Sequence, residues 1–280
     1  EIIHILPGNS GGLPSMVPEV KYYSPEADAS WVVKKFEFIR YDSPNVLTDK
    51  FVPREDAALV FHFRNRPQML APVKLTLPAF FVSPVIPTAN SISLTGQNDT
   101  MIVICKPTVL SRVLGISLTA GCFSWVTLPE KLFSPVWAAM REENEPEMRM
   151  ELFSGFINSL CPSGYVPDET DRSYDLMIRK GIGTQLPDII KELGVSQRTL
   201  QRRFRDRLGT SPKMLIRIMR INYLWGITSS GGKIDYHDLV FLGNYFDQNH
   251  LIKDFKSITG ETPDIFFRRN LCVARIFSGK

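Results

Sequence analysis

The amino-acid sequence predicts an α+β fold: a β-rich N-terminal domain, sandwich- or barrel-like and flanked by helices, followed by an all-α domain of two helix-turn-helix units joined by a long helix. Strand-forming segments separated by Pro, Asn and Gly fill much of the first 107 residues and indicate the β domain. Two matching helical patterns, 51 residues apart, indicate the two units. We expect the β-rich regulatory domain at 1–125, a helical pair and linker at 126–165, and the two-unit domain at 166–280.

Composition excludes several broad classes of protein. No run approaches the roughly 18 uninterrupted apolar residues that a membrane helix requires, so no membrane partner is expected. The first residues lack the basic start and extended apolar core of a secretory signal. Cys105, Cys122, Cys161 and Cys272 are scattered, without a CxxC pair or a His at ligand spacing. We therefore expect reduced, mostly buried thiols in a cytoplasmic protein, with no metal and no cofactor.

The charge is divided unevenly along the chain. Residues 171–280 carry 19 Lys and Arg against 11 Asp and Glu, a net charge of +8. The whole chain holds 33 basic and 29 acidic residues, so residues 1–170 have a net charge of −4. A basic C-terminal third on an acidic body is typical of a protein that binds a polyphosphate such as DNA.

The N-terminal strands are predicted from β-branched and aromatic residues between turn formers. After about 30 residues rich in Gly, Pro and Ser, expected to be irregular, the pattern predicts strands at 31–40, 51–63, 73–84, 91–96 and 100–107. Their spacing is typical of an antiparallel sandwich or barrel. Two interpretations remain for four aromatic residues, which either form the core of this domain or line a ligand pocket: Phe61, Phe63, Phe80 and Phe81.

Helical patterns replace the strands after Cys105. A short helix is predicted at 107–114, ending near Gly115, and two amphipathic helices at 128–140 and 147–160. This antiparallel pair either packs on its own domain or forms a homodimer surface. The Pro- and Gly-containing segment 161–170, where the net charge changes sign, is the predicted linker.

The segment from Gln185 to Gly209 predicts two short helices joined by a tight turn. Gly194 is placed for a left-handed cap on the first helix, and Ser196 for a side-chain cap on the second. The second helix buries Leu200 and Phe204 and presents an outer face of Gln and Arg. Such a face suits a reader of the DNA major groove, although taken alone it also fits a helical hairpin with a solvated basic surface.

A repeat favours the DNA-binding interpretation. A cap, two core residues, a glycine and a proline recur after 51 positions: Ser196, Leu200, Phe204, Gly209 and Pro212 correspond to Asp247, Leu251, Phe255, Gly260 and Pro263. Asn244 takes the place of Gly194, as Asn often does in the left-handed region. The helix predicted at 212–228 spans roughly 24 Å, a distance of the order that sets two reading helices about one DNA turn, roughly 34 Å, apart.

Residues from about 171 to 270 resemble the DNA-binding domain of the AraC/XylS family of bacterial transcription regulators. The resemblance rests on GVSQRTLQRRFRDRLGTSP (194–212) and, more specifically, on NYFDQNHLIKDFKSITGETP (244–263). The chain departs from the family pattern at Ile190, Val240, Asn244 and Leu251, which implies slightly altered helix packing. More faintly, the N-terminal part resembles a domain of unassigned function that often precedes such DNA-binding domains.

The resemblance implies a sequence-specific regulator whose partner is double-stranded promoter DNA, with RNA polymerase as a further partner if it is an activator. It gives the N-terminal domain a role in sensing a small-molecule effector, in dimerisation, or in both. The positions that face bases in relatives of this fold are Arg198, Gln201, Arg202, Gln248, Asn249 and Lys253. Candidates for DNA backbone contacts are Gln197, Arg203, Arg205, Lys213, Lys256 and Arg268, with Arg207, Arg217 and Arg269 in the same pool.

The second reading helix is poorer in Arg, so we expect the first unit to contribute more of the affinity for DNA. No GxSxG, HExxH or P-loop motif is present, and no catalytic residue is predicted. The alternative is a DNA-repair-type enzyme and regulator with a reactive cysteine, but Cys161-Pro162 has the expected Pro-Cys order reversed. We expect His62 to be a packed or hydrogen-bonded core residue, and His250 to serve packing or a phosphate contact.

Overall fold

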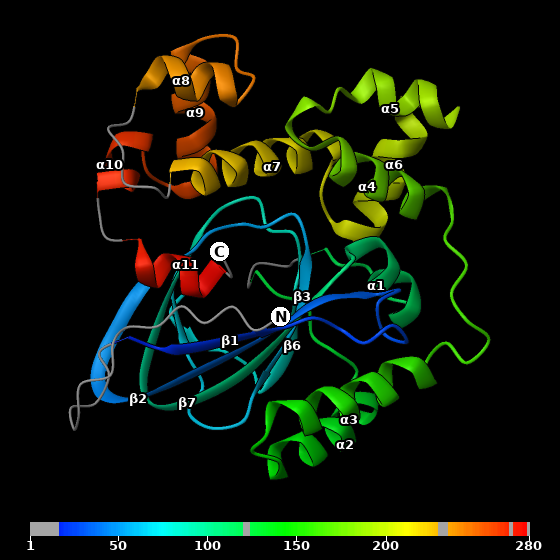
Figure 1. Ribbon diagram of the computed structural model, residues 1–280, viewed down its shortest axis with the longest axis vertical. Coiled ribbons are helices and arrows are strands. Elements are labelled where there is room, and N and C mark those ends of the chain that lie inside the picture. The colour runs from blue at the N-terminus through cyan, green and yellow to red at the C-terminus, as the bar shows by residue number, and fades with distance from the viewer. Residues whose placement is uncertain (1–16, 120–123, 229–234, 269–270, 279–280) are drawn as a thin grey trace.

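The computed structural model describes residues 17–119, 124–228, 235–268 and 271–278. A β domain lies on one side and an all-α domain on the other, as predicted (Figure 1). The described strands are β1 (Glu19–Tyr23), β2 (Val33–Phe51), β3 (Ala57–His62), β4 (Gln68–Ala71), β5 (Leu75–Thr76), β6 (Phe80–Ser83) and β7 (Asn90–Cys105). They pair antiparallel in the order β1-β2-β7-β3-β6, and β4 joins β7 and β5.

The sheet is organised by two long strands that the sequence did not reveal. β2 and β7 pair from Val33 opposite Cys105 to Phe51 opposite Asn90, with a shift in register between Ser43 and Leu47. The strands predicted at 91–96 and 100–107 are therefore one strand, and that prediction was wrong. Gly96, the last residue of the strand predicted at 91–96, has a φ of 69° inside β7, where a glycine marks an irregularity in a continuous strand.

Other predicted strand boundaries also need correction. The segment predicted as a strand at 51–63 is divided, because Phe51 ends β2 and the chain leaves the sheet before β3. The segment at 73–84 is divided at Pro78, which cannot donate a ladder hydrogen bond. The N-terminal stretch predicted to be irregular contains β1, and every residue of β1 pairs with β2.

Both faces of the sheet are buried. Alternate residues of β2, β3 and β7, such as Phe36, Phe61 and Val103, pack beneath helices α1 (Pro107–Leu114), α2 (Glu130–Glu142) and α3 (Pro146–Ser159). The intervening residues, such as Val60 and Ile102, face the other side of the sheet and belong to a second apolar cluster. This double burial explains why β3 is buried at every position.

The helices after β7 follow the prediction closely. α1 has the predicted bounds and ends at Gly115, whose φ of 63° is left-handed. The pair α2 and α3 packs on its own domain, and the Phe133 and Phe153 rings are fully buried 6.5 and 5.9 Å from that of Phe61. Among the four aromatic residues with two interpretations, Phe61 and Phe63 belong to this core, and Phe80 packs against it.

The α domain contains α4 (Glu169–Lys180), a 3-10 turn (Gly181–Gly183), α5 (Leu186–Leu193), α6 (Gln197–Leu208), α7 (Pro212–Ile227), α8 (Tyr236–Leu242), α9 (Gln248–Thr259) and α10 (Pro263–Arg268). The following helix, α11 (Cys272–Ser278), packs on β2 of the β domain. Phe204, Trp225 and Phe255 are among the buried side chains in the core of the α domain. α4 begins at Glu169 because Asp168 caps it, accepting hydrogen bonds from the backbone of Thr170 and Asp171. None of the helices in the described ranges is long and apolar enough to cross a lipid bilayer.

The predicted linker is packed against both domains. The ring of Tyr165 stacks on that of Trp31 with 5.4 Å between centroids, and its hydroxyl donates a 2.7 Å hydrogen bond to Asp171. The expectation of mostly buried cysteines was wrong among those described. Cys105 is buried, whereas Cys161 is half-buried and Cys272 lies exposed at the start of α11; Cys122 falls outside the described residues.

The β domain contacts both halves of the α domain. At one end, the backbone N–H of Leu118 donates a 2.8 Å hydrogen bond to the carbonyl of Arg207 in α6. At the other end, Lys50 of β2 reaches the Thr259 carbonyl and the Glu261 carboxylate, both at 2.9 Å. The backbone of Ala89 donates a 2.7 Å hydrogen bond to Ile258 of α9. Both helical units are therefore held by the same β domain.

Candidate DNA interface

The first helix-turn-helix unit forms as its sequence predicts. Gly194 ends α5 with a φ of 63°, and the Ser196 hydroxyl accepts a hydrogen bond from the Thr199 backbone at 3.1 Å to begin α6. Ile189 is buried against the core, while Gly209 ends α6 with a φ of 68°. The direction of α6 is thus fixed at both ends by local backbone chemistry.

The second unit repeats this geometry. Asn244 has a φ of 53°, which confirms the left-handed conformation expected where the first unit has Gly194. Asp247 caps α9 by accepting a hydrogen bond from the His250 backbone at 2.7 Å. Gly260 ends the helix with a φ of 76°. The two units therefore share their caps and terminators as well as their core residues.

The six predicted base-reading residues are all exposed: Arg198, Gln201 and Arg202 on α6, and Gln248, Asn249 and Lys253 on α9. On α6 Arg198 and Arg202 lie opposite the buried pair that anchors the helix, and on α9 Asn249 and Lys253 do so, because residues three and four apart share one face. Gln248, three residues before the buried Leu251, is exposed at the first position of α9. α6 lies near one end of α7 and α9 near the other (Figure 1). Two exposed polar faces are thus mounted on one helix of about 24 Å.

A basic groove lies between the two units. It has a volume of about 450 Å³ and is lined by the start of α5 and by parts of α7 and α9. Lys213, Arg217 and Arg220 follow one another along α7 at four- and three-residue spacing and line the groove. Asp254, which pairs with Arg217, lines it as well. His250 also lines the groove, with its ring 5.2 Å from that of Tyr245. Arg220 was not among the residues predicted from the sequence, although its position three residues after Arg217 on the same helix could have indicated it.

The candidates for DNA backbone contacts divide into two groups. Gln197, Arg205, Lys213 and Lys256 are exposed. The others have acidic partners within the chain: Arg203 pairs with Glu169, Arg268 with Asp264, Arg207 with Asp168 and Asp171, and Arg217 with Asp254. Arg269 lies outside the described residues.

The ion pairs of Arg207 keep its guanidinium group bound within the protein, so that it is not available to a ligand. Burial alone would raise the pKa of Asp168, but Arg207 and the capped backbone N–H groups outweigh it and lower that pKa to about 2. Asp171, its second partner, is almost fully buried. Arg207 therefore ties α6 to the start of α4 and serves the fold.

Neither described candidate for unusual chemistry favours catalysis. Burial raises the pKa of the Cys105 thiol well above its usual range, which disfavours the nucleophilic thiolate. His62 is buried, as expected, and its Nδ1 lies 2.8 Å from the Thr100 hydroxyl.

One family model matches the part of the chain that holds the two units. Residues 189–269 match the family described as "Helix-turn-helix domain". No curated protein is significantly similar to the chain. Among solved structures, the chain is similar to ToxT from Vibrio cholerae O395, with 15% identity over 83% of this chain and 96% of that one and a TM-score of 0.43. It is also similar to an apo ToxT variant from strain SCE256, with 14% identity over 88% and 99% of the two chains and a TM-score of 0.44.

A further structure of ToxT, described as bound to an unsaturated fatty acid, is 15% identical over 83% of this chain and 94% of that one, with a TM-score of 0.43. The family match covers both units and the α7 helix between them. Residues 189–269 therefore form a helix-turn-helix domain.

Proposed function

We propose that this protein is a sequence-specific transcription regulator in which α6 and α9 enter successive major grooves on one face of promoter DNA. The observation that carries the proposal is the pair of matched units at the two ends of α7, each with an exposed polar face. One chain then reads a bipartite site. The distance between α6 and α9 is fixed by α7, which connects the two units, and by the β domain, which contacts both of them.

The residue roles follow from side-chain chemistry. Arg198 and Arg202 pair with guanine, and Gln201 with adenine, on the first half-site. On the second, Gln248, Asn249 and Lys253 contact base edges. The basic stripe on α7 faces the DNA backbone between the half-sites, where Lys213 contributes an exposed positive charge.

The N-terminal domain is proposed to sense an effector. An apolar cavity between the sheet and α11 supports this role, because the chain that leaves the DNA-binding domain forms part of its wall. Dimerisation is the second role, for which α2 and α3 offer the partly exposed side chains of Leu132 and Met148. RNA polymerase is the further partner expected of an activator.

Selection of bound sequences from a random DNA library tests the proposed function. We expect a bipartite motif with half-sites about ten base pairs apart. Binding should weaken steeply as salt concentration rises, since phosphate contacts release counterions. Absence of any enriched motif would contradict sequence-specific binding. A single half-site would contradict the use of both units.

Dimerisation is tested separately by sedimentation of the purified chain. Substituting Leu132 and Met148 by Ser should shift a dimer to monomer while leaving the buried side of α2 and α3 intact. A native chain that sediments as a monomer at all concentrations would rule out this role. It would leave the DNA-binding proposal standing.

A further inference from the structure

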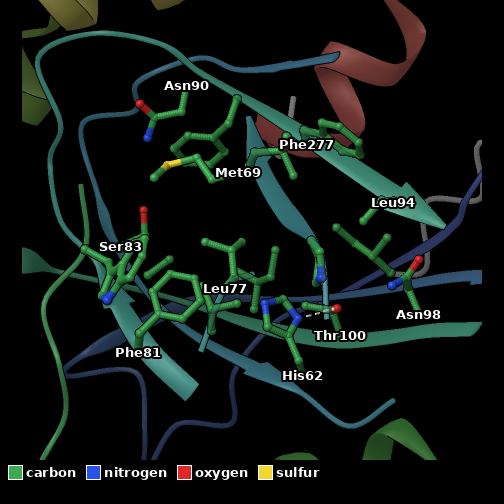
Figure 2. A pocket seen from close by; sticks show the side chains of 18 of the residues that line it. His62, Met69, Leu77, Phe81, Ser83, Asn90, Leu94, Asn98, Thr100 and Phe277 are labelled. Atoms are coloured by element: carbon green, nitrogen blue, oxygen red, sulfur yellow. Dashed lines mark hydrogen bonds between the residues drawn. The ribbon is translucent and has the colours of Figure 1, made fainter. Parts of the chain in front are cut away.

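The β domain encloses an apolar cavity on the face of the sheet opposite α2 and α3. Its volume is about 90 Å³, and its walls come from β2, β3 and β7, from β4 and β6, and from α11 (Figure 2). Val60 and Ile102 face it from the sheet, Met69 from β4 and Phe81 from β6, while Phe277 lines it from α11. This volume is smaller than the roughly 150 Å³ of an apolar cavity that holds benzene, so a molecule of about one ring requires the wall to expand, with the flexible Met69 side chain as the part best able to move.

Two buried polar atoms at the cavity have no hydrogen-bond partner among the residues that the structure describes. The His62 ring, only 3% exposed, has Nδ1 2.8 Å from the Thr100 hydroxyl, while its Nε2 is unpaired (Figure 2). Asn98, 4% exposed, donates a 2.6 Å hydrogen bond to the Asn65 carbonyl, while its Oδ1 is unpaired. Unpaired polar atoms of this kind are rare in folded proteins and unfavourable. Both side chains line the same cavity.

The cavity favours a neutral ligand. Among the described residues that line it, none carries a carboxylate, ammonium or guanidinium group. Burial, helped by the charge of Arg66, lowers the pKa of His62 to about 3, so its imidazole is uncharged at neutral pH. An ionised ligand would lose its hydration without gaining a counter-charge. A neutral imidazole can donate or accept at Nε2, depending on its tautomer, whereas Asn98 Oδ1 can only accept.

We propose that this cavity binds a neutral, largely apolar small molecule of about one ring, whose single hydroxyl-type group hydrogen-bonds to His62 Nε2 or Asn98 Oδ1. The proposal rests on the effector-sensing role above and names the class of effector. The apolar walls supply the affinity, and the two polar atoms select molecules that carry one donor. None of the described residues in the wall offers a positive charge to a carboxylate.

Three probes of similar size separate these contributions: phenol, toluene and benzoate. They are titrated into the full-length protein by calorimetry at neutral pH. We expect phenol to bind about tenfold more tightly than toluene, the usual value of one buried hydrogen bond, and benzoate to bind more weakly than both. This series needs no variant and therefore decides the question on the native chain.

Two variants locate the site. Substituting His62→Phe should remove most of the preference for phenol over toluene while toluene still binds. Substituting Ala58→Leu, which places a larger side chain in the cavity wall, should weaken phenol and toluene alike. Thermal melting shows whether each variant is folded.

The proposal is overturned if none of the probes binds, if benzoate matches phenol, or if phenol does no better than toluene. Phenol binding that is unchanged in a folded Ala58→Leu chain would also overturn it, by placing the ligand elsewhere. DNA binding measured on the same preparation keeps the two proposals distinct. A chain that binds DNA but no probe contradicts only the ligand site, and a chain that binds phenol but not DNA contradicts only the proposed function.

Discussion

At the scale of single residues, the neighbours of an arginine decide its use. Arg202 and Arg207 lie five positions apart on the same helix. Arg202 is exposed on the outer face of α6, whereas Arg207 is held by Asp168 and Asp171 at the start of α4. A count of positive charges on α6 would treat them alike. The structure assigns Arg207 to the fold and leaves Arg202 available for a base.

Substituting Arg202→Ala should weaken binding to the selected DNA site by roughly 5- to 150-fold, the usual range for losing a bidentate contact to guanine. Lys253→Ala should have a smaller effect, because a lysine on α9 contributes a single point charge. Fluorescence anisotropy measures both. Lys131→Ala, at an exposed position on α2, is the control that removes one charge far from the proposed interface. If Lys253→Ala abolishes binding and Arg202→Ala does not, the predicted ranking of the two units is wrong.

His62 should make stability depend on pH in acid. Its pKa is about 3 in the folded chain and 6.5 when unfolded, so the unfolded chain binds more protons between these values. Stability is therefore lost as pH falls from 6.5 towards 3, by about 1.4 kcal/mol per pH unit in the middle of the range. Urea unfolding at pH 7 and pH 5 should show this loss in the native chain and a smaller one in His62→Phe.

His237, exposed on α8, provides the control for this measurement. The variant His237→Phe should retain the full pH dependence, because it leaves the buried His62 in place. Equal pH dependence in native and His62→Phe chains would show that the buried imidazole does not govern acid stability.

At the scale of elements, two glycines with the same local role differ in their surroundings. Gly194 and Gly209 each end a helix with a left-handed φ. A Cβ added at Gly194 would meet nothing within 4 Å, whereas one at Gly209 would lie 2.5 Å from the Thr119 Cα. The loop after α1 therefore crosses directly over the end of α6. The glycine serves the contact between domains as well as the turn.

Gly209→Ala should destabilise the protein by about 3 kcal/mol or more, because it combines left-handed strain with a collision against backbone. Gly194→Ala should cost about 1 kcal/mol, the strain alone. Urea unfolding of the two variants beside the native chain measures the difference. Equal losses would mean that the Thr119 loop moves aside without cost, and that its contact with α6 contributes little.

The sequence predicted helices better than strands, for a physical reason. Ser196, Gly209 and Asp247 end or begin helices through contacts within four residues, so their roles can be read locally. Gly96 looks the same in sequence, but its place inside β7 depends on pairing with β2, more than 50 residues away. Strand continuity is set by partners that a local pattern does not contain.

The DNA interface and the cavity also differ in how far the sequence could predict them. The exposed faces of α6 and α9 follow from helical periodicity and could be predicted. The cavity could not, because His62 meets Thr100 only through the register between β3 and β7. Phe81 illustrates why the residues of the cavity wall could not be predicted. Of the four aromatic residues left with two interpretations, Phe61, Phe63 and Phe80 joined the core, and only Phe81 lines the cavity.

At the scale of the whole molecule, the cavity wall and the contacts to the second unit alternate along the same segments. Phe51 lines the cavity, while its neighbour Lys50 binds the end of α9. Asn90 lines the cavity, while Ala89 donates a hydrogen bond to α9. Adjacent residues of an extended strand point in opposite directions. A displacement of the cavity wall therefore also displaces the neighbouring contacts with α9. The second unit thus contacts residues that are adjacent in the chain to the cavity wall.

Phenol should therefore alter amide hydrogen exchange in α9 and α11 more than in α6. Ser278 of α11 accepts a 2.8 Å hydrogen bond from the Val52 backbone, which ties α11 to the same segment of the chain. In Lys50→Ala, phenol should still bind and still affect α11, but its effect on α9 should be reduced. Exchange read by mass spectrometry, with and without phenol, measures each helix separately.

Lys21→Ala is the matched control, because Lys21 pairs with Glu19 on β1, away from the α domain. It should leave the response of α9 unchanged. A phenol effect confined to the β strands would show that the cavity is not coupled to the DNA-binding domain. A full α9 response in Lys50→Ala would place the coupling elsewhere, with the Ala89 backbone contact as the remaining route. Either result separates ligand binding from its transmission, because phenol affinity is measured on the same variants.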